Sequence, residues 1–231
     1  MIRLIVALSL LSAVSGCMNR KPVPVQPPPG GDHVVAAARL GRTGGYLTVR
    51  NAASRIRVVL ATLPGLLYRI STPADSGLTP RVTGAGGRVG VSLLPTGGDG
   101  PDEVRIVLNR EVRWQISLPA GAGEQQLDLR RGRISRLDLG ASGLVELNLP
   151  EPDGAVPITL GGGVGSATVT AEAGTPLRLQ LDQGAAAWPG GPAAPPGTVW
   201  QTLGRPAASG RYAIRALAPI GTLTLRTRQK E

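Results

Sequence analysis

The feature that most restricts the fold is a series of short apolar pairs, repeated about every ten residues in the second half of the chain. In EQQLDLRRGRISRLDLGASGLVELNLPEPDGAVPITLGGGVGSATVTAEAGTPLRLQLDQG, a single residue separates the two apolar members of each pair. Alternation with period two is typical of β-strands that bury one face. The pairs are Leu127/Leu129, Leu137/Leu139, Leu147/Leu149, Ile158/Leu160, Ala167/Val169 and Leu177/Leu179.

The same alternation occurs earlier in the chain, for example at Leu47 and Val49 and at Ile106 and Leu108. Hydrophobic residues make up 42% of the chain and there is no Phe, so aliphatic side chains must supply the core. The 33 Gly and 21 Pro punctuate the apolar segments, which suits turns between strands. We therefore predict one all-β domain over 33–228, less regular over 33–103 and repetitive over 104–228.

Two architectures produce such a repeat. One is a parallel β-solenoid, in which two short strands form a coil of about 20 residues. The other is an antiparallel β-sandwich, with strands every 8–12 residues. Very short strands, uniformly small or aliphatic inward positions and the absence of an Asn-Gly hairpin signal favour the solenoid.

The first residues predict export. Arg3 precedes an apolar run from Leu4 to Val14, which is shorter than the about 20 residues of a membrane-spanning helix. The run fits the apolar region of a signal peptide. Val14-Ser15-Gly16-Cys17 follows it, with the only cysteine of the chain.

The segment VSGC resembles the lipobox of bacterial lipoproteins. This resemblance implies a signal peptide over 1–16 and a diacylglyceryl group on the sulfur of Cys17, which would be the first mature residue. Two alternatives stay open: an ordinary signal peptide that leaves a free thiol, and an N-terminal core helix. With one cysteine there is no disulfide framework, so burial must stabilise the body.

A Pro-rich segment follows the cysteine, so residues 17–32 are expected to form a lipidated cysteine with an extended tether. Arg20 and Lys21 lie next to the expected anchor, where they would attract anionic lipid head groups. The predicted location is the extracytoplasmic face of the cell membrane.

The repeat itself also resembles a known family. The stretch from VRWQISLPAGAGEQQLDL to the closing IGTLTL looks like a bacterial family of repeat-β domains, known as adhesin-like domains or as the C-terminal domain of cell-wall-active-antibiotic-response proteins. The resemblance covers about Val104 to Arg228 and rests on patterns of Gly and aliphatic residues. It implies a β-solenoid in the cell envelope and supplies no catalytic residues.

Charge and aromatic residues indicate a candidate binding surface. The net charge is +10, carried almost entirely by Arg, which suits an anionic partner such as a wall polymer or lipid. Widely spread Arg and only 3% aromatics do not fit a nucleic-acid binder. The segment 183–209 is expected to be a long loop that exposes Trp188 and Trp200, or that covers the open end of the solenoid. Arg130 and Arg136 are further candidate surface residues, expected to neighbour Asp128 and Asp138 across coils.

Motifs for chemistry are weak. His33 is the only histidine, no Gly-x-Ser-x-Gly segment is present, and Gly161–Gly165 does not match either phosphate-binding fingerprint. These glycines are expected to allow a tight corner. We therefore expect no enzyme activity, no metal site and no cofactor.

The expected function is a structural, adhesive or sensory role for a lipid-anchored envelope protein, whose partners are membrane lipid, wall polymer or another envelope protein. The alternatives are a binding module for an anionic wall polymer or glycan, and a hydrolase with dispersed carboxylates.

Overall fold

The computed structural model describes residues 31–202 and 210–229, which contain β-strands and no helix. The all-β prediction is confirmed, whereas the expected signal peptide and Cys17 lie outside the described residues. The strands are β1 (His33–Ala38), β2 (Gly44–Val49), β3 (Arg55–Ala61), β4 (Leu66–Thr72), β5 (Leu78–Thr83), β6 (Arg88–Pro95), β7 (Glu103–Asn109), β8 (Arg113–Leu118), β9 (Ala122–Asp128), β10 (Arg133–Leu139), β11 (Ser142–Asn148), β12 (Gly154–Leu160), β13 (Val164–Glu172), β14 (Leu177–Leu181), β15 (Ala185–Ala187), β16 (Thr198–Gln201), β17 (Gly210–Ala216) and β18 (Ile220–Arg228).

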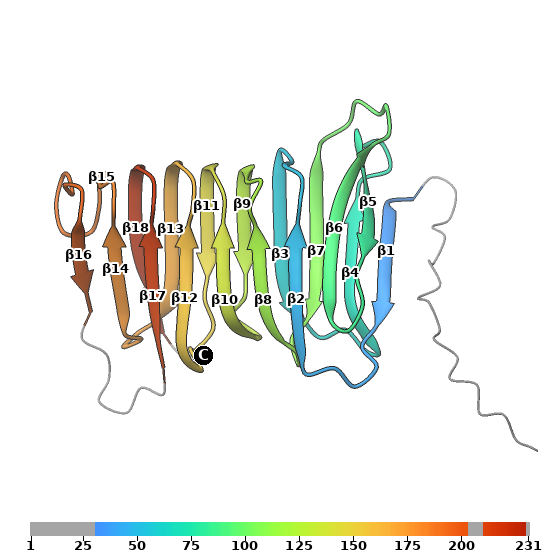
Figure 1. Ribbon diagram of the computed structural model, residues 1–231, viewed down its shortest axis with the longest axis horizontal. Helices are drawn as coiled ribbons and strands as arrows, with labels where there is room; N and C mark the ends of the chain where they lie inside the picture. Colours follow the sequence, from blue (N-terminus) through green and yellow to red (C-terminus); the bar gives the residue numbers. More distant parts are fainter. Residues whose placement is uncertain (1–30, 203–209, 230–231) are drawn as a thin grey trace, which may run out of the picture.

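These strands form two nine-stranded sheets, in which the strands lie side by side (Figure 1). We call the body formed by these two sheets the rack. Sheet A has the order β1-β4-β7-β3-β9-β11-β13-β18-β15, and sheet B has the order β16-β14-β17-β12-β10-β8-β2-β6-β5. Neighbouring strands pair in parallel through the middle of both sheets. Antiparallel pairs lie toward the ends, at β1·β4, β4·β7, β5·β6 and β14·β16.

A sheet B strand followed by a sheet A strand forms one coil, as in β8 and β9 or β10 and β11. Leu127 pairs with Leu147 of the next coil, and Leu147 pairs with Val169 of the coil after that. Each apolar pair thus lies beside the next pair but one in the sequence, which agrees with the predicted coil of about 20 residues. The repeat is therefore β-solenoid-like.

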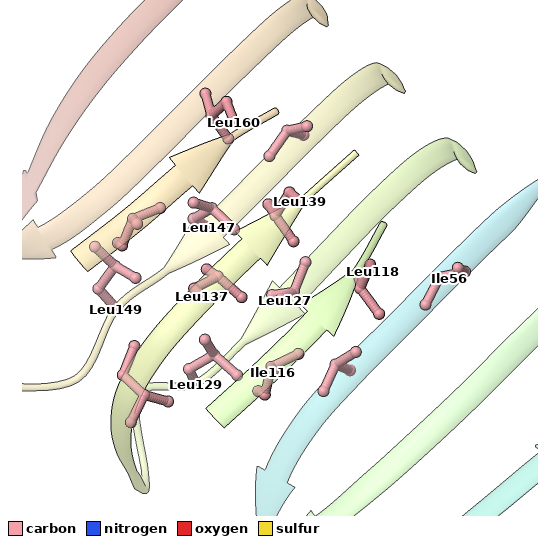
Figure 2. Close-up of a cluster of buried hydrophobic side chains, with 14 of the residues drawn as sticks. Ile56, Ile116, Leu118, Leu127, Leu129, Leu137, Leu139, Leu147, Leu149 and Leu160 are labelled. Carbon is pink, nitrogen blue, oxygen red and sulfur yellow. The ribbon is translucent and has the colours of Figure 1, made fainter. Parts of the chain in front are cut away.

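The apolar members of the sequence pairs fill the space between the sheets. Figure 2 shows Leu127, Leu137 and Leu147 among the stacked side chains of successive coils. All of the pairs identified in the sequence are buried in one continuous cluster. Stacked Leu and Ile side chains thus stabilise the body without a disulfide in its described part, since burying one such side chain contributes about 1.5–3 kcal/mol.

The coils do not stack in the order of the sequence. From one end of the rack to the other they run β6–β7, β2–β3, β8–β9, β10–β11, β12–β13, β17–β18 and β14–β15. At each end, one coil is inserted between two coils that are nearer to each other in the sequence. The strand β18, at the end of the described chain, consequently pairs with β13 on one side and β15 on the other.

The short connections from sheet B to sheet A form one long edge of the rack, which we call the glycine edge. It comprises 119–121, 140–141, 161–163 and 217–219. These four segments contain no charged residue, whereas the corresponding connections at 50–54 and 182–184 include Arg50 and Asp182. A column of glycines lies beside these corners. A Cβ built on Gly143, Gly165 or Gly221 would lie 3.0, 2.7 or 2.4 Å from the carbonyl oxygen of the preceding member of the column.

The glycine-rich stretch at 161–165 belongs to this edge. A Cβ on Gly162 would lie 2.5 Å from the backbone N of Ala141, whereas one on Gly161 would make only an ordinary contact at 3.5 Å. The predicted role of these glycines in a tight corner therefore holds for Gly162 and Gly165 but is not required at Gly161.

Both ends of the rack are closed by segments that the repeat pattern did not describe. At one end, β1, β4 and β5 cover the last coil, with Leu67 and Tyr68 in the core. The less regular part, 33–103, thus contributes both stacked coils and an end cap. At the other end, β16 pairs with β14 and places Trp200 opposite the buried Leu179.

Candidate binding surfaces

The two tryptophans proposed from the sequence close the far end of the rack. Trp188 and Trp200 meet edge to face, with ring centroids 6.5 Å apart, and both are half-buried against the core. The indole N–H of Trp188 donates to the carbonyl of Ala193 at 3.1 Å. The described part of the expected long loop instead contains β15 and β16. Of the two roles considered for these tryptophans, covering the open end matches the observed packing.

The two candidate arginines are engaged in ion pairs. The guanidinium of Arg130 donates two hydrogen bonds to Asp128, at 2.8 and 2.7 Å, and Arg136 donates to Asp138 at 2.7 Å. Each acid is two residues from its Arg along the chain. The pairs were expected across coils but form within one segment, because the side chains of residues i and i+2 already share one face of a strand.

Neither arginine lies at the tryptophan end. Arg130 follows β9 and Arg136 belongs to β10, whereas Trp188 and Trp200 lie beyond β14 and β15. The structure therefore does not bring the sequence candidates together into one site. Cys17 lies outside the described residues.

The outer face of sheet A carries charges of both signs. Arg55 donates to Glu124 at 2.7 Å and reaches Glu103 at 3.4 Å. The hydrogen bond from Arg55 holds the pKa of Glu124 below its usual range. Similarly, the hydrogen bond from Arg130 lowers the pKa of Asp128. This face is a solvated surface of partly compensated charge.

The outer face of sheet B near the β5 end is different. The strands β5, β6, β2 and β8 contain three Arg and no Asp or Glu. Arg88 lies beside Tyr46, and Arg81 lies beside Ser92. The ring of Tyr46 is exposed, since 53% of the residue surface is accessible. We call the outward side of β5, β6 and β2, with Arg50, Arg81, Arg88 and Tyr46, the basic face.

The middle of the basic face is shaped by a glycine. Gly90 faces outward between Thr83 of β5 and Thr48 of β2. A Cβ built there would lie 3.1 Å from Nη2 of Arg50. The guanidinium of Arg50, which follows β2, thus lies across Gly90. The sequence already shows that these four strands contain no acid. Only the pairing of β2 with β6 shows that Tyr46 and Arg88 lie side by side on one face.

A shallow depression of about 370 Å³ lies on the glycine edge. It is lined by Ala, Gly and Ser, including Ala122, Ala141 and Ser142. Inside the core nearby, the fully buried Gln125 donates to the carbonyls of Gly140 and Ala141, both at 3.3 Å. The side chain of Gln125 thus supports this corner from within.

Within 31–202 and 210–229, no group of three or more His, Cys, Asp or Glu side chains could hold a metal ion. In that part of the chain there is also no helix with the length and apolar character needed to cross a bilayer.

Comparisons with known proteins agree with the repeat architecture. Residues 91–170 match the N-terminal domain of toast_rack, DUF2154. A candidate cell adhesion protein from Clostridium sporogenes has a similar solved structure, with a TM-score of 0.67 and 17% sequence identity over 86% of this chain and 99% of that chain. This likeness supports the fold.

A candidate adhesin from Bacteroides fragilis is more distant, with a TM-score of 0.26 and 9% identity over 82% of this chain and 96% of that one. No curated protein sequence matches the chain significantly.

Proposed function

We propose that this protein is a lipid-anchored module of the cell envelope that presents a rigid β surface in a structural, adhesive or sensory role and catalyses no reaction. Its body is interpreted as a parallel β-solenoid with antiparallel ends, since the strands of successive coils pair in parallel through the middle of both sheets.

The proposal rests on the position of β1, the first strand of the described chain. The described chain enters the rack through β1, an edge strand of sheet A (Figure 1). Between Cys17 and this strand lies the segment KPVPVQPPPGG, which begins at Lys21 and is rich in Pro. Such a sequence favours an extended, semi-rigid spacer. A lipid on Cys17 would therefore hold the rack by one end and leave both outer faces free.

The charged side chains support a structural role for several of the acids. Arg215 donates to Asp182 at 2.9 Å, and this hydrogen bond lowers the pKa of Asp182. Glu124 and Asp128 have lowered pKa values for the same reason. Carboxylates held in such pairs stay ionised and are poor proton donors. This observation favours a binding or structural role over the alternative of a hydrolase with dispersed carboxylates.

The test is mass spectrometry of the membrane-extracted protein, compared with a Cys17→Ala variant. We expect the wild type to begin at an acylated Cys17 and to stay with the membrane fraction, and the variant to lose both properties. A wild-type chain released without acylation would contradict the anchor.

A further inference from the structure

We propose that the basic face binds a linear anionic glycan that lies across strands β5, β6 and β2. The inference rests on the proposed envelope role and deepens it, because it assigns a ligand class and a place on the rack. It does not depend on acylation of Cys17.

Uncompensated charge is the first argument. Arg50, Arg81 and Arg88 are exposed, and none of them has an ion pair within the described residues. The nearest acid on a strand of sheet B is Asp138, which lies on β10 and is paired with Arg136. Since β10 is three strands from β6, the two strands are about 14 Å apart across the sheet.

Three acids in nearby loops lie toward one end of the basic face, and Glu111, which precedes β8 at the other end, is ion-paired with Arg39. Asp75, Asp99 and Asp102 flank the ends of β5 and β6 where Leu78 pairs with Pro95. Arg88 begins β6 and therefore lies at the opposite end of that strand. The charge of the face thus stays positive around Arg88 and Gly90.

The shape of the surface is the second argument. The basic face is the side of a sheet, where neighbouring strands are about 4.8 Å apart and alternate residues point outward. Such a surface can contact an extended chain over several strands. Gly90, which lies between Thr48 and Thr83 at the centre of this face, has no side chain. The guanidinium of Arg50 can therefore lie across it.

The neighbouring polar groups are the third argument. Tyr46 offers an exposed ring beside Arg88, which suits stacking against a sugar ring. Thr48, Thr83 and Ser92 face outward around Gly90 and supply hydroxyl groups that can donate to or accept from sugar hydroxyls. One exposed ring does not provide the series of stacking platforms that a single-stranded nucleic acid uses.

The test measures binding of the full chain, carrying Cys17→Ser, to polygalacturonate, a linear carboxylated polysaccharide. Neutral dextran, long-chain polyphosphate and phosphatidylglycerol vesicles serve as comparison ligands. We expect binding to polygalacturonate that weakens as salt is added, because bound cations release counterions from a polyanion.

Two triple variants distinguish binding by the basic face from binding that depends only on the net charge of the protein. R50Q/R81Q/R88Q removes the basic face, and R69Q/R105Q/R226Q removes three exposed arginines from strands of sheet A. Both variants lower the formal charge from +10 to +7 (10 − 3). We expect the first to weaken binding about a hundredfold and the second about twofold or less.

The remaining outcomes decide the ligand class. Y46A should weaken binding to polygalacturonate but leave binding to polyphosphate unchanged. Equal losses in both triple variants, or no binding by the wild type, would overturn the proposal. Binding to vesicles without binding to the glycan would also overturn it and point to lipid.

Unchanged unfolding midpoints of the variants exclude misfolding. Loss of the Cys17 anchor would leave the measured glycan binding unaffected.

Discussion

At the scale of the residue, Trp114 and Gly45 show how closely neighbouring strands pack. Trp114 is fully buried, and its indole N–H donates to the carbonyl of Asn109 at 3.0 Å. It pairs with Gly45, where a Cβ would lie only 2.6 Å from the indole ring. The large ring on one strand thus requires the absence of a side chain on the next.

The column of glycines gives the first prediction. In Gly221→Ala, the new methyl group would lie 2.4 Å from the carbonyl oxygen of Gly165, which is backbone and cannot move away cheaply. We expect a loss of about 1–3 kcal/mol in the free energy of unfolding, measured by denaturant titration. Gly161→Ala is the matched control, because its methyl group would meet only an ordinary contact at 3.5 Å. Equal effects of the two substitutions would contradict close stacking at this column.

The buried Tyr212 gives a prediction about pH. Burial raises the pKa of its hydroxyl, which donates to the carbonyl of Pro150 at 2.9 Å. Since the pKa is higher in the folded state, its contribution to stability is fully present below the unfolded value of about 10 and is lost progressively as pH rises above it. Tyr212→Phe should remove this alkaline loss and cost about 1 kcal/mol at neutral pH.

Unfolding midpoints measured between neutral and alkaline pH test this expectation. Tyr46→Phe is the control, since Tyr46 is exposed. An alkaline loss that persists unchanged in Tyr212→Phe would show that another group causes it.

At the scale of the element, the coils stack in an order that differs from their order in the sequence. The strand β18 lies between β13 and β15, so the last coil along the described chain is not the last in the stack. Ser166 pairs with Thr222, and Thr222 pairs with Ala187, in one row across three strands. A stack in the order of the sequence would instead place β15 directly beside β13.

Engineered disulfides distinguish these two orders. In a Cys17→Ser background, Ser166→Cys with Thr222→Cys should form a crosslink on oxidation, because adjacent strands are about 4.8 Å apart. Ser166→Cys with Ala187→Cys should not, because two strand spacings exceed the reach of a disulfide. Mass spectrometry after oxidation reads out both pairs, and the reverse result would require the sequential order.

At the scale of the whole molecule, the two sheets have different surfaces. Sheet A carries acids and bases together, whereas sheet B near β5 carries arginine without acid on its strands. The chain enters the rack at this same end, through β1 (Figure 1). A tether from Cys17 would therefore hold the end that bears the basic face, and the acylation and glycan-binding experiments test these two features separately.

The sequence alone determined the local structure. The alternation predicts that Leu127, Leu129 and the other apolar pairs are buried on β-strands. All of them are buried, although Leu129 and Leu149 lie just after the ends of β9 and β11. Period-two alternation reports which residues face the core, because the side chains of a strand point alternately to its two faces. Some of the glycines mark turns as expected, such as Gly121 with its positive φ, whereas others, such as Gly45 and Gly90, lie within strands.

Only the tertiary structure decided which strands are neighbours. Alternation is the same for any partner, so it could not reveal that β2 lies between β6 and β8, or that β18 lies between β13 and β15. That pairing brings Tyr46 beside Arg88 and Arg50 across Gly90, although the members of each pair are far apart in the sequence. The basic face thus depends on the strand order, whereas VSGC, the segment that predicts lipidation and export, is recognised from the sequence alone.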